Sequence, residues 1–145
     1  MSGYLTPHEI AATLIETGQK KTQLRSDRVF LLAILAGVFI GFACQLATTV
    51  ATGPFEWVGL QKFMVGAVFS VGLMLVVIPG SELWTGNTLM TVSLLEKRIT
   101  LGSMLKNWLL VWTGNLTGAI MLAFFIALCS GLDSGEYGGT AIKIA

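Results

Sequence analysis

The distribution of hydrophobic and polar positions divides the chain into a polar N-terminal segment, residues 1–28, and three long apolar runs within residues 29–130. The runs cover residues 29–51, 60–95 and 107–130. A membrane-spanning helix needs about 20 mostly apolar residues to cross a hydrocarbon core of about 30 Å. The pattern therefore predicts a three-span unit, followed by residues 131–145 as an external tail that contains the start of a next helix.

The second run is interrupted in its middle. Across residues 63–95 the sequence has one ionisable side chain, that of Glu82, and it lies in the polar stretch 79–87. A continuous helix over these residues would be about 50 Å long, longer than a bilayer core, yet the run is too short for two spans. We expect one crossing made of two helical pieces, because Pro79 lacks an N–H and two glycines accept unusual backbone angles.

Irregular backbone in a membrane is tolerated where it is buried in protein or lines a watery cavity, since lipid offers no hydrogen bonds. In channels and transporters, helix N-termini and exposed amides at such breaks meet anions. The interruption therefore predicts a pore or binding site. The alternative is that Pro79 and Gly80 end a span and that residues 81–87 form an ordinary surface loop.

Composition places the chain among polytopic membrane proteins. Of its 145 residues, 54% are hydrophobic and 12% are charged, which is outside the soluble globular range. Cys44 and Cys129 lie within apolar runs, where free thiols behave as small hydrophobes. We interpret His8, the single histidine, as a solvated residue near a helix start. No nucleophile, metal cluster or phosphate loop supports an enzyme, and neither a cofactor nor a nucleic-acid partner is predicted.

The N-terminal segment carries a helix start. Thr6 and Glu9 have the spacing of a capping box, and Pro7 fits the first helical position. The sequence therefore predicts a short amphipathic helix, either on the membrane surface or packed under the bundle. The apolar residues that share one side of this helix are Ile10, Leu14 and Ile15.

Basic residues are unevenly distributed among the connections. Most precede the first run or lie between the second and third, whereas the other two connections carry only Lys62 and Lys143. The positive-inside rule then predicts a multi-pass protein of the cell membrane with a cytoplasmic N-terminus and an external tail. The residues of the basic connections are Lys20, Lys21, Arg25, Arg28, Lys97, Arg98 and Lys106.

The third run contains a polar side chain, that of Asn115, between small residues. Small residues let membrane helices approach closely, and a polar group at this depth needs a partner. We interpret Asn115 as a packing contact between helices in preference to a pore-lining group.

Four stretches resemble the formate/nitrite transporter family of bacterial and archaeal anion channels. They are FSVGL at 69–73, GSELWTGN at 80–87, KNWL at 106–109 and GNLTGA at 114–119. The resemblance extends from the N-terminal helix to Lys143. It implies an aquaporin-like helical bundle of six spans in two inverted repeats, assembled as a homopentamer with one pore per protomer. The chain resembles the first repeat, whose second span is broken.

The resemblance also implies roles for individual residues. An outer aromatic and an inner apolar pair form the pore constriction, and the loop threonine faces a central histidine of the second repeat. Trp84 stands where phenylalanine is usual and implies an altered gate. We expect Glu82 to be structural, accepting hydrogen bonds from loop amides. The implied constriction is Phe69, Leu73, Leu83 and Trp84, the substrate-facing loop is Thr85, Gly86 and Asn87, and the vestibule lysines are Lys21 and Lys143.

The implied activity is a passive or proton-linked channel for small monovalent anions: formate or nitrite, with hydrosulfide as a further class. Cationic vestibules would concentrate an anion that is costly to desolvate, and protonation would let it cross an apolar slit as a neutral acid. From spacing alone, ordinary interfacial anchoring is the favoured interpretation of Lys21 and Lys143, and it is the resemblance that favours the vestibule role.

A second hypothesis is a non-conducting structural or assembly half-subunit that needs another membrane chain. Three crossings supply one wall of a slit, so we expect the 145 residues not to conduct alone. The partner would be three further spans, as a continuation or a separate fragment. The ending, residues 141–145, reads as a helix just begun and suggests a longer parent chain.

Overall fold

The structure of the protein, a computed structural model, describes residues 4–130 and 136–144. Within these residues the secondary structure is helical apart from turns and short connections, which confirms the predicted all-α class. The predicted tail begins with residues 131–135, which lie outside the described part. The helices are α1 (Pro7–Gln23), α2 (Ser26–Thr52), α3 (Val58–Val77), α4 (Trp84–Asn87), α5 (Met90–Leu95), α6 (Leu101–Ser130) and α7 (Glu136–Ile144).

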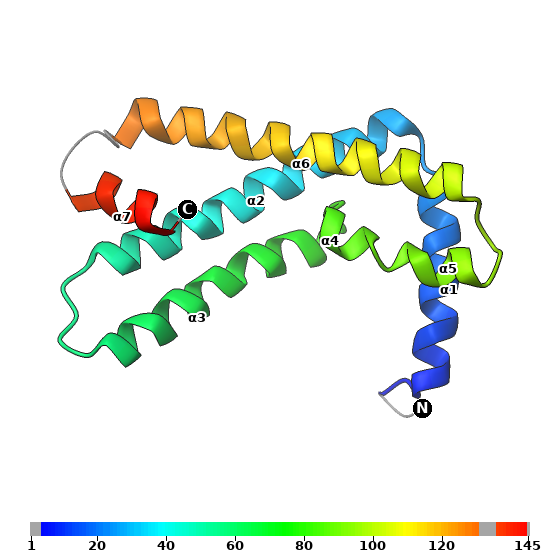
Figure 1. Ribbon diagram of the computed structural model, residues 1–145, viewed down its shortest axis with the longest axis horizontal. Coiled ribbons are helices and arrows are strands. Elements are labelled where there is room, and N and C mark those ends of the chain that lie inside the picture. Colours follow the sequence, from blue (N-terminus) through cyan, green and yellow to red (C-terminus); the bar gives the residue numbers. More distant parts are fainter. Residues whose placement is uncertain (1–3, 131–135, 145) are drawn as a thin grey trace.

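The helices α2, α3 and α6 are long and apolar enough to cross a membrane. At about 1.5 Å per residue, the 27 residues of α2 and the 30 of α6 exceed a core of about 30 Å, and the 20 of α3 match it. Figure 1 shows α2 and α6 running in one direction and α3 in the other. These helices bear out the prediction of an all-α membrane protein.

The contact between α2 and α6 is the most extensive in the molecule, and glycines make it close. A Cβ atom on Gly37 of α2 would overlap the carbonyl oxygen of Asn115, and one on Gly118 of α6 would overlap that of Ile34. Each backbone therefore lies where a side chain on the other helix would be, which is the membrane mode of packing by small residues. This pair forms the rigid frame of the fold.

Among the long helices of the described residues, α3 makes its extensive contact with α2. Gly72 permits this contact, because a Cβ there would overlap the Cβ of Ala43. Only Gly72 and Val76 of α3 are buried. The remaining sides of α3 are open to lipid, water or further protein.

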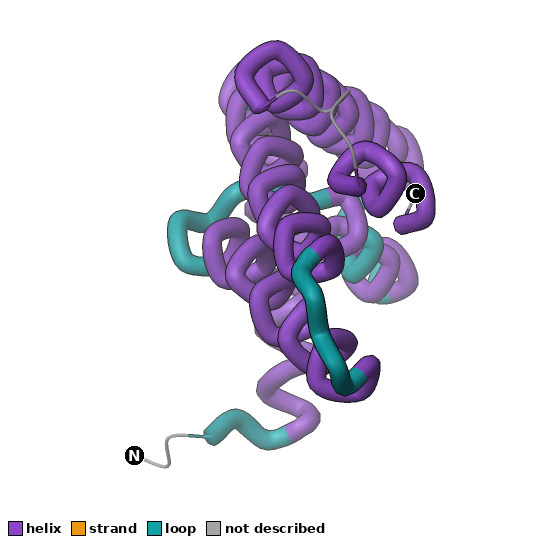
Figure 2. The backbone as a smooth tube through the Cα atoms, turned by 90° about the vertical axis from the view of Figure 1, so that its left-hand side faces the viewer, coloured by secondary structure: helices purple, strands orange, loops and turns teal. Residues whose placement is uncertain are grey.

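The helix α1 projects from the long helices at one end of the molecule (Figure 1, Figure 2). Its capping box is confirmed: Thr6 Oγ1 accepts from the Glu9 N–H, and the Glu9 carboxylate accepts from the Thr6 N–H at 2.7 Å. The hydrogen bonds from Thr6 lower the pKa of Glu9. Farther along, α1 packs on α5, where Gly18 faces Ser93 and the Ser93 hydroxyl donates to the Ile15 carbonyl at 3.0 Å.

Candidate functional site

The interrupted span has an ordered backbone. The helix α3 ends at Val77 and α4 begins at Trp84. Between them, residues 78–80 form a turn and residues 81–83 a short irregular stretch, and we call residues 78–83 the break. Gly80 has a φ of 73°, a left-handed conformation that favours glycine. The Ser81 N–H donates to the Val76 carbonyl at 2.9 Å, and the Glu82 N–H donates to Leu32 of α2 at 3.3 Å. Protein groups thus satisfy these amides, as irregular backbone at membrane depth requires.

The carboxylate of Glu82 lies buried behind the break, with 4% of the residue exposed. Its Oε2 accepts from Lys21 Nζ at 2.6 Å and from Asn87 Nδ2 at 2.7 Å. The expected hydrogen bonding of Glu82 is therefore present, but its partners are a side-chain amide and a lysine of α1. The ion pair to Lys21 was not predicted, since it joins positions 61 residues apart.

Asn115 joins the break to both frame helices. Its Oδ1 accepts from the Trp84 N–H at 2.9 Å, and its Nδ2 donates to the carbonyls of Ala33 and Glu82 at 2.8 and 2.9 Å. The side-chain oxygen and both N–H groups of Asn115 are therefore engaged. The interpretation of Asn115 as a packing contact is confirmed.

Two further residues of α6 hold α4 in place. Asn107 Oδ1 accepts from Asn87 Nδ2 at 2.8 Å, and Trp108 Nε1 donates to the Asn87 carbonyl at 2.9 Å. Trp108 also meets Trp84 edge to face, with ring centroids 6.0 Å apart. Sequence reasoning missed the roles of Asn107 and Trp108, and the available signal was the KNWL stretch at 106–109.

A hollow of about 670 Å³ adjoins the break, between α1 and the end of α3. We call it the break hollow. The Thr85 side chain is exposed here, and among the described residues its hydroxyl makes no hydrogen bond. The hollow brings together most of the residues assigned by resemblance: Lys21, Leu73, Leu83, Thr85, Gly86 and Asn87.

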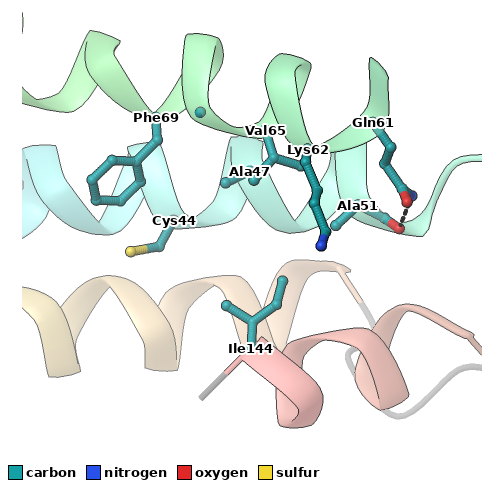
Figure 3. Close-up of a pocket in the computed structure, with 9 residues that line it drawn as sticks. Cys44, Ala47, Ala51, Gln61, Lys62, Val65, Phe69 and Ile144 are labelled. Carbon is teal, nitrogen blue, oxygen red and sulfur yellow. Dashed lines mark hydrogen bonds between the residues drawn. The ribbon is translucent and has the colours of Figure 1, made fainter. Parts of the chain in front are cut away.

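Phe69 lines a different hollow, of about 430 Å³, between α2, α3 and the end of α7. We call it the Phe69 hollow. In Figure 3 the Lys62 side chain extends from α3 toward α7, where Ile144 faces it. Positions 62, 69 and 73 are separated by seven and four residues and so share one side of a helix. Because Leu73 belongs to the break hollow, the two hollows follow the same face of α3.

Two residues assigned by resemblance lie elsewhere. Trp84 is not among the residues that line the break hollow, because its ring packs on the buried cluster of Val29, Ala33 and Val111. The backbone N–H of Trp84 donates to Asn115 Oδ1 of α6, which holds the start of α4 next to this cluster. Lys143 is exposed on α7 and is not part of the Phe69 hollow, although its neighbour Ile144 is.

Charge in the described residues is concentrated at the end that carries α1 and α5. The other ion pairs there, Arg25 with Asp27 at 2.8 Å and Lys20 with Glu16 at 4.0 Å, are exposed and contribute little. Within residues 4–130 and 136–144, no group of three or more His, Cys, Asp or Glu side chains could hold a metal ion.

Three apolar helices long enough to cross a membrane, with a buried polar network behind a break and a hollow beside it, place the chain among helical membrane proteins. The sequence model for the formate/nitrite transporter matches residues 8–145, so the chain belongs to the formate/nitrite transporter family. This is a family of transporters and channels, not of enzymes, and the resemblance seen in the sequence is confirmed.

The relatives named for transport are similar along nearly the whole chain. A probable formate transporter of Methanothermobacter thermautotrophicus is 38% identical over 139 residues, 93% of this chain and 51% of that protein. The formate channel BtFdhC of Bacillus thuringiensis is 38% identical over 96% of this chain and 54% of its own. The formate channel FocA of Escherichia coli strain K12 is 39% identical, with coverages of 92% and 45%. The chain thus spans about half the length of these relatives.

Proposed function

We propose that this chain forms part of a channel or transporter for small monovalent anions, with formate as the first substrate to test. The relatives named as formate transporters and channels support formate, and the family description supports nitrite. Hydrosulfide and proton linkage belong to the same proposal. The observation that carries it is the break hollow, where the free Thr85 hydroxyl faces a space that Lys21 also borders.

The proposed path follows one face of α3. An anion would enter the Phe69 hollow beside Lys62, pass Phe69 and Leu73, and reach Thr85 in the break hollow. Desolvating the charged form is costly between these apolar side chains, and low dielectric favours the neutral acid. Formate and nitrite can take up a proton and become neutral, which is the chemical basis for a proton-linked passage.

Lys21 has two roles in this proposal. The opposite charges of Lys21 and Glu82 nearly cancel at long range, so this ion pair does not attract distant anions. Other basic residues at the same end would attract them. An ammonium group has three donors, and the side chain of Lys21 remains 21% exposed. We propose that Lys21 holds α1 against the break and donates a hydrogen bond to an anion in the hollow.

Further membrane segments complete the proposal. Pro79, Gly80, Thr85 and Gly86 are exposed, and polar backbone is costly in contact with hydrocarbon. We propose that three more spans, in continuation or as a separate fragment, cover the break, and that the assembly is a homopentamer in the cell membrane with the basic end cytoplasmic. The mass of the purified complex in mild detergent tests this: a stable monomer of 15.5 kDa would contradict it.

The transport test replaces the hydroxyl of Thr85. In membranes where the protein carries formate, Thr85→Val keeps the shape but removes the donor, and we expect formate uptake to fall about tenfold. Thr85→Ser retains the hydroxyl and serves as the matched control. Unchanged uptake in Thr85→Val, with normal assembly, would contradict the proposal. The hypothesis of a non-conducting half-subunit has no comparable support, since the named relatives are channels and transporters.

A further inference from the structure

A third hollow, of about 170 Å³, lies at the basic end between the last turn of α1 and the first turns of α2 and α6. We call it the Asn107 hollow. Lys21 borders it on one side and the break hollow on the other. Its volume is several times the roughly 30 Å³ that one water molecule occupies, so it can admit a small polar group.

The side-chain amide of Asn107 directs N–H groups that have no hydrogen-bond acceptor in the part of the chain that the structure describes toward this hollow. The residue is 5% exposed, and its Oδ1 accepts from Asn87 Nδ2. The orientation of Asn87 is fixed in turn, because the Glu82 carboxylate needs a donor. Asn107 Nδ2 makes no hydrogen bond among the described residues, although every fully enclosed side-chain nitrogen or oxygen there has a partner. The amide N–H groups are therefore reached from the hollow that Asn107 lines.

Two lysines border these donors, and one of them, Lys21, is paired with the Glu82 carboxylate. Lys106 and Lys21 line the hollow, and no carboxylate does. Lys106 is exposed and has no ion pair within the described residues. Ser26 begins α2, whose first N–H groups have no side-chain cap, so the positive end of a 27-residue helix dipole lies at the hollow. Asp27 in the same turn is paired with Arg25 and does not line the hollow. Amide donors, ammonium groups and a helix N-terminus together select an oxyanion.

We propose that the Asn107 hollow binds a phosphate group, supplied by the headgroup of an anionic phospholipid. Basic pockets between membrane helices are a recognised form of headgroup site. Val29 and Leu110 also line the hollow, and they belong to helices that enter the apolar part of the molecule. They provide the apolar contact that the glycerol and first acyl carbons of a lipid need and that a free phosphate ion does not.

The test measures lipid binding by the purified protein in mild detergent. Native mass spectrometry with phosphatidylglycerol or phosphatidylcholine distinguishes the anionic headgroup from a neutral one, and inorganic phosphate added at the same concentration distinguishes a free ion from a lipid. We expect phosphatidylglycerol to bind at least tenfold more tightly than phosphatidylcholine, and phosphate not to displace it. If inorganic phosphate displaces phosphatidylglycerol and is bound in its place, the hollow is a phosphate site, but the proposal that a lipid supplies the phosphate group is overturned.

Two variants connect the binding to the hollow. Lys106→Gln removes an exposed charge, and we expect about tenfold weaker phosphatidylglycerol binding, which Lys106→Arg restores. Asn107→Asp keeps the acceptor for Asn87 but turns a carboxylate oxygen toward the hollow, so binding should be lost in a folded protein. Lys20→Gln, at an exposed lysine that does not line the hollow, is the control. Equal binding of the two lipids, or unchanged binding in both Lys106→Gln and Asn107→Asp, would overturn the proposal.

Discussion

The two sides of α2 differ in how completely they are closed. Toward α6, glycines on both helices bring the backbones into direct contact, and Ala33, Ala36 and Val111 are 0% exposed. Toward α3, one glycine makes the contact and most of α3 stays open. Hollows adjoin α3 near both of its ends. The closed side is a frame that fixes distances, and the open side presents the groups that can meet a ligand.

Between the two sides lies the polar network of Glu82, Lys21, Asn87 and Asn115. It connects the break to α1, α2 and α6, so the frame determines where the break lies. Polar groups buried at membrane depth are stable only when their partners are complete. Substitutions in the network, the frame and the open face should therefore differ in the size of their effects.

The largest effect is expected at the network. Glu82→Gln leaves the ammonium of Lys21 without its carboxylate, and we expect about 3 kcal/mol of destabilisation, since breaking a buried pair exposes the full desolvation cost of the remaining charge. Thermal unfolding in detergent measures it. Glu16→Gln removes the exposed pair with Lys20 and should change stability by less than about 0.5 kcal/mol. Similar results for the two variants would show that the network does not hold the break.

A smaller effect is expected for the frame. Gly118→Ala places a methyl group against the Ile34 carbonyl, and we expect about 2 kcal/mol of destabilisation from the displaced helices. Gly66→Ala adds the same group on α3, where nothing lies within 4 Å, and should be neutral or slightly stabilising. The same unfolding measurement compares them. If both substitutions are equally tolerated, the two sides of α2 do not differ as described.

The smallest effect is expected at the mouth of the open face. In membranes where the protein transports formate, Lys62→Gln should lower formate uptake about threefold at low ionic strength. Added salt should reduce the difference in uptake between this variant and the unsubstituted protein. Lys143→Gln, which removes the lysine assigned by resemblance, should have a weaker effect because Lys143 does not line the Phe69 hollow. A larger loss of formate uptake in Lys143→Gln than in Lys62→Gln would show that the lysine at the outer mouth is Lys143 of α7.

The parts of the fold that the sequence predicts are those set by neighbouring residues. Run lengths determine the crossing helices, and Thr6 with Glu9 determines the start of α1. Glu82 and Pro79 mark the interruption, because a proline and an isolated charged residue change the backbone and the polarity of their immediate sequence neighbours.

The partners of the site residues could not be predicted because they depend on packing between distant segments. Lys21 reaches Glu82 only because Gly18 lets α1 approach Ser93 of α5. The ring of Trp84 packs on the core cluster, and the backbone N–H of Trp84 donates to Asn115, 31 residues later. Resemblance supplied candidate residues, and the three-dimensional arrangement places most of them in two hollows and leaves Trp84 and Lys143 outside both.

The most direct test of the account asks whether water and anions reach Thr85. Thr85→Cys, in a background with Cys44→Ala and Cys129→Ala, is treated with a small charged thiol reagent, and Val111→Cys in the closed frame is the reference. The account predicts rapid labelling of Thr85→Cys, slowed by formate, and almost none of Val111→Cys, whose native side chain is 0% exposed. Labelling of Thr85→Cys as slow as that of Val111→Cys, with no effect of formate, would contradict it.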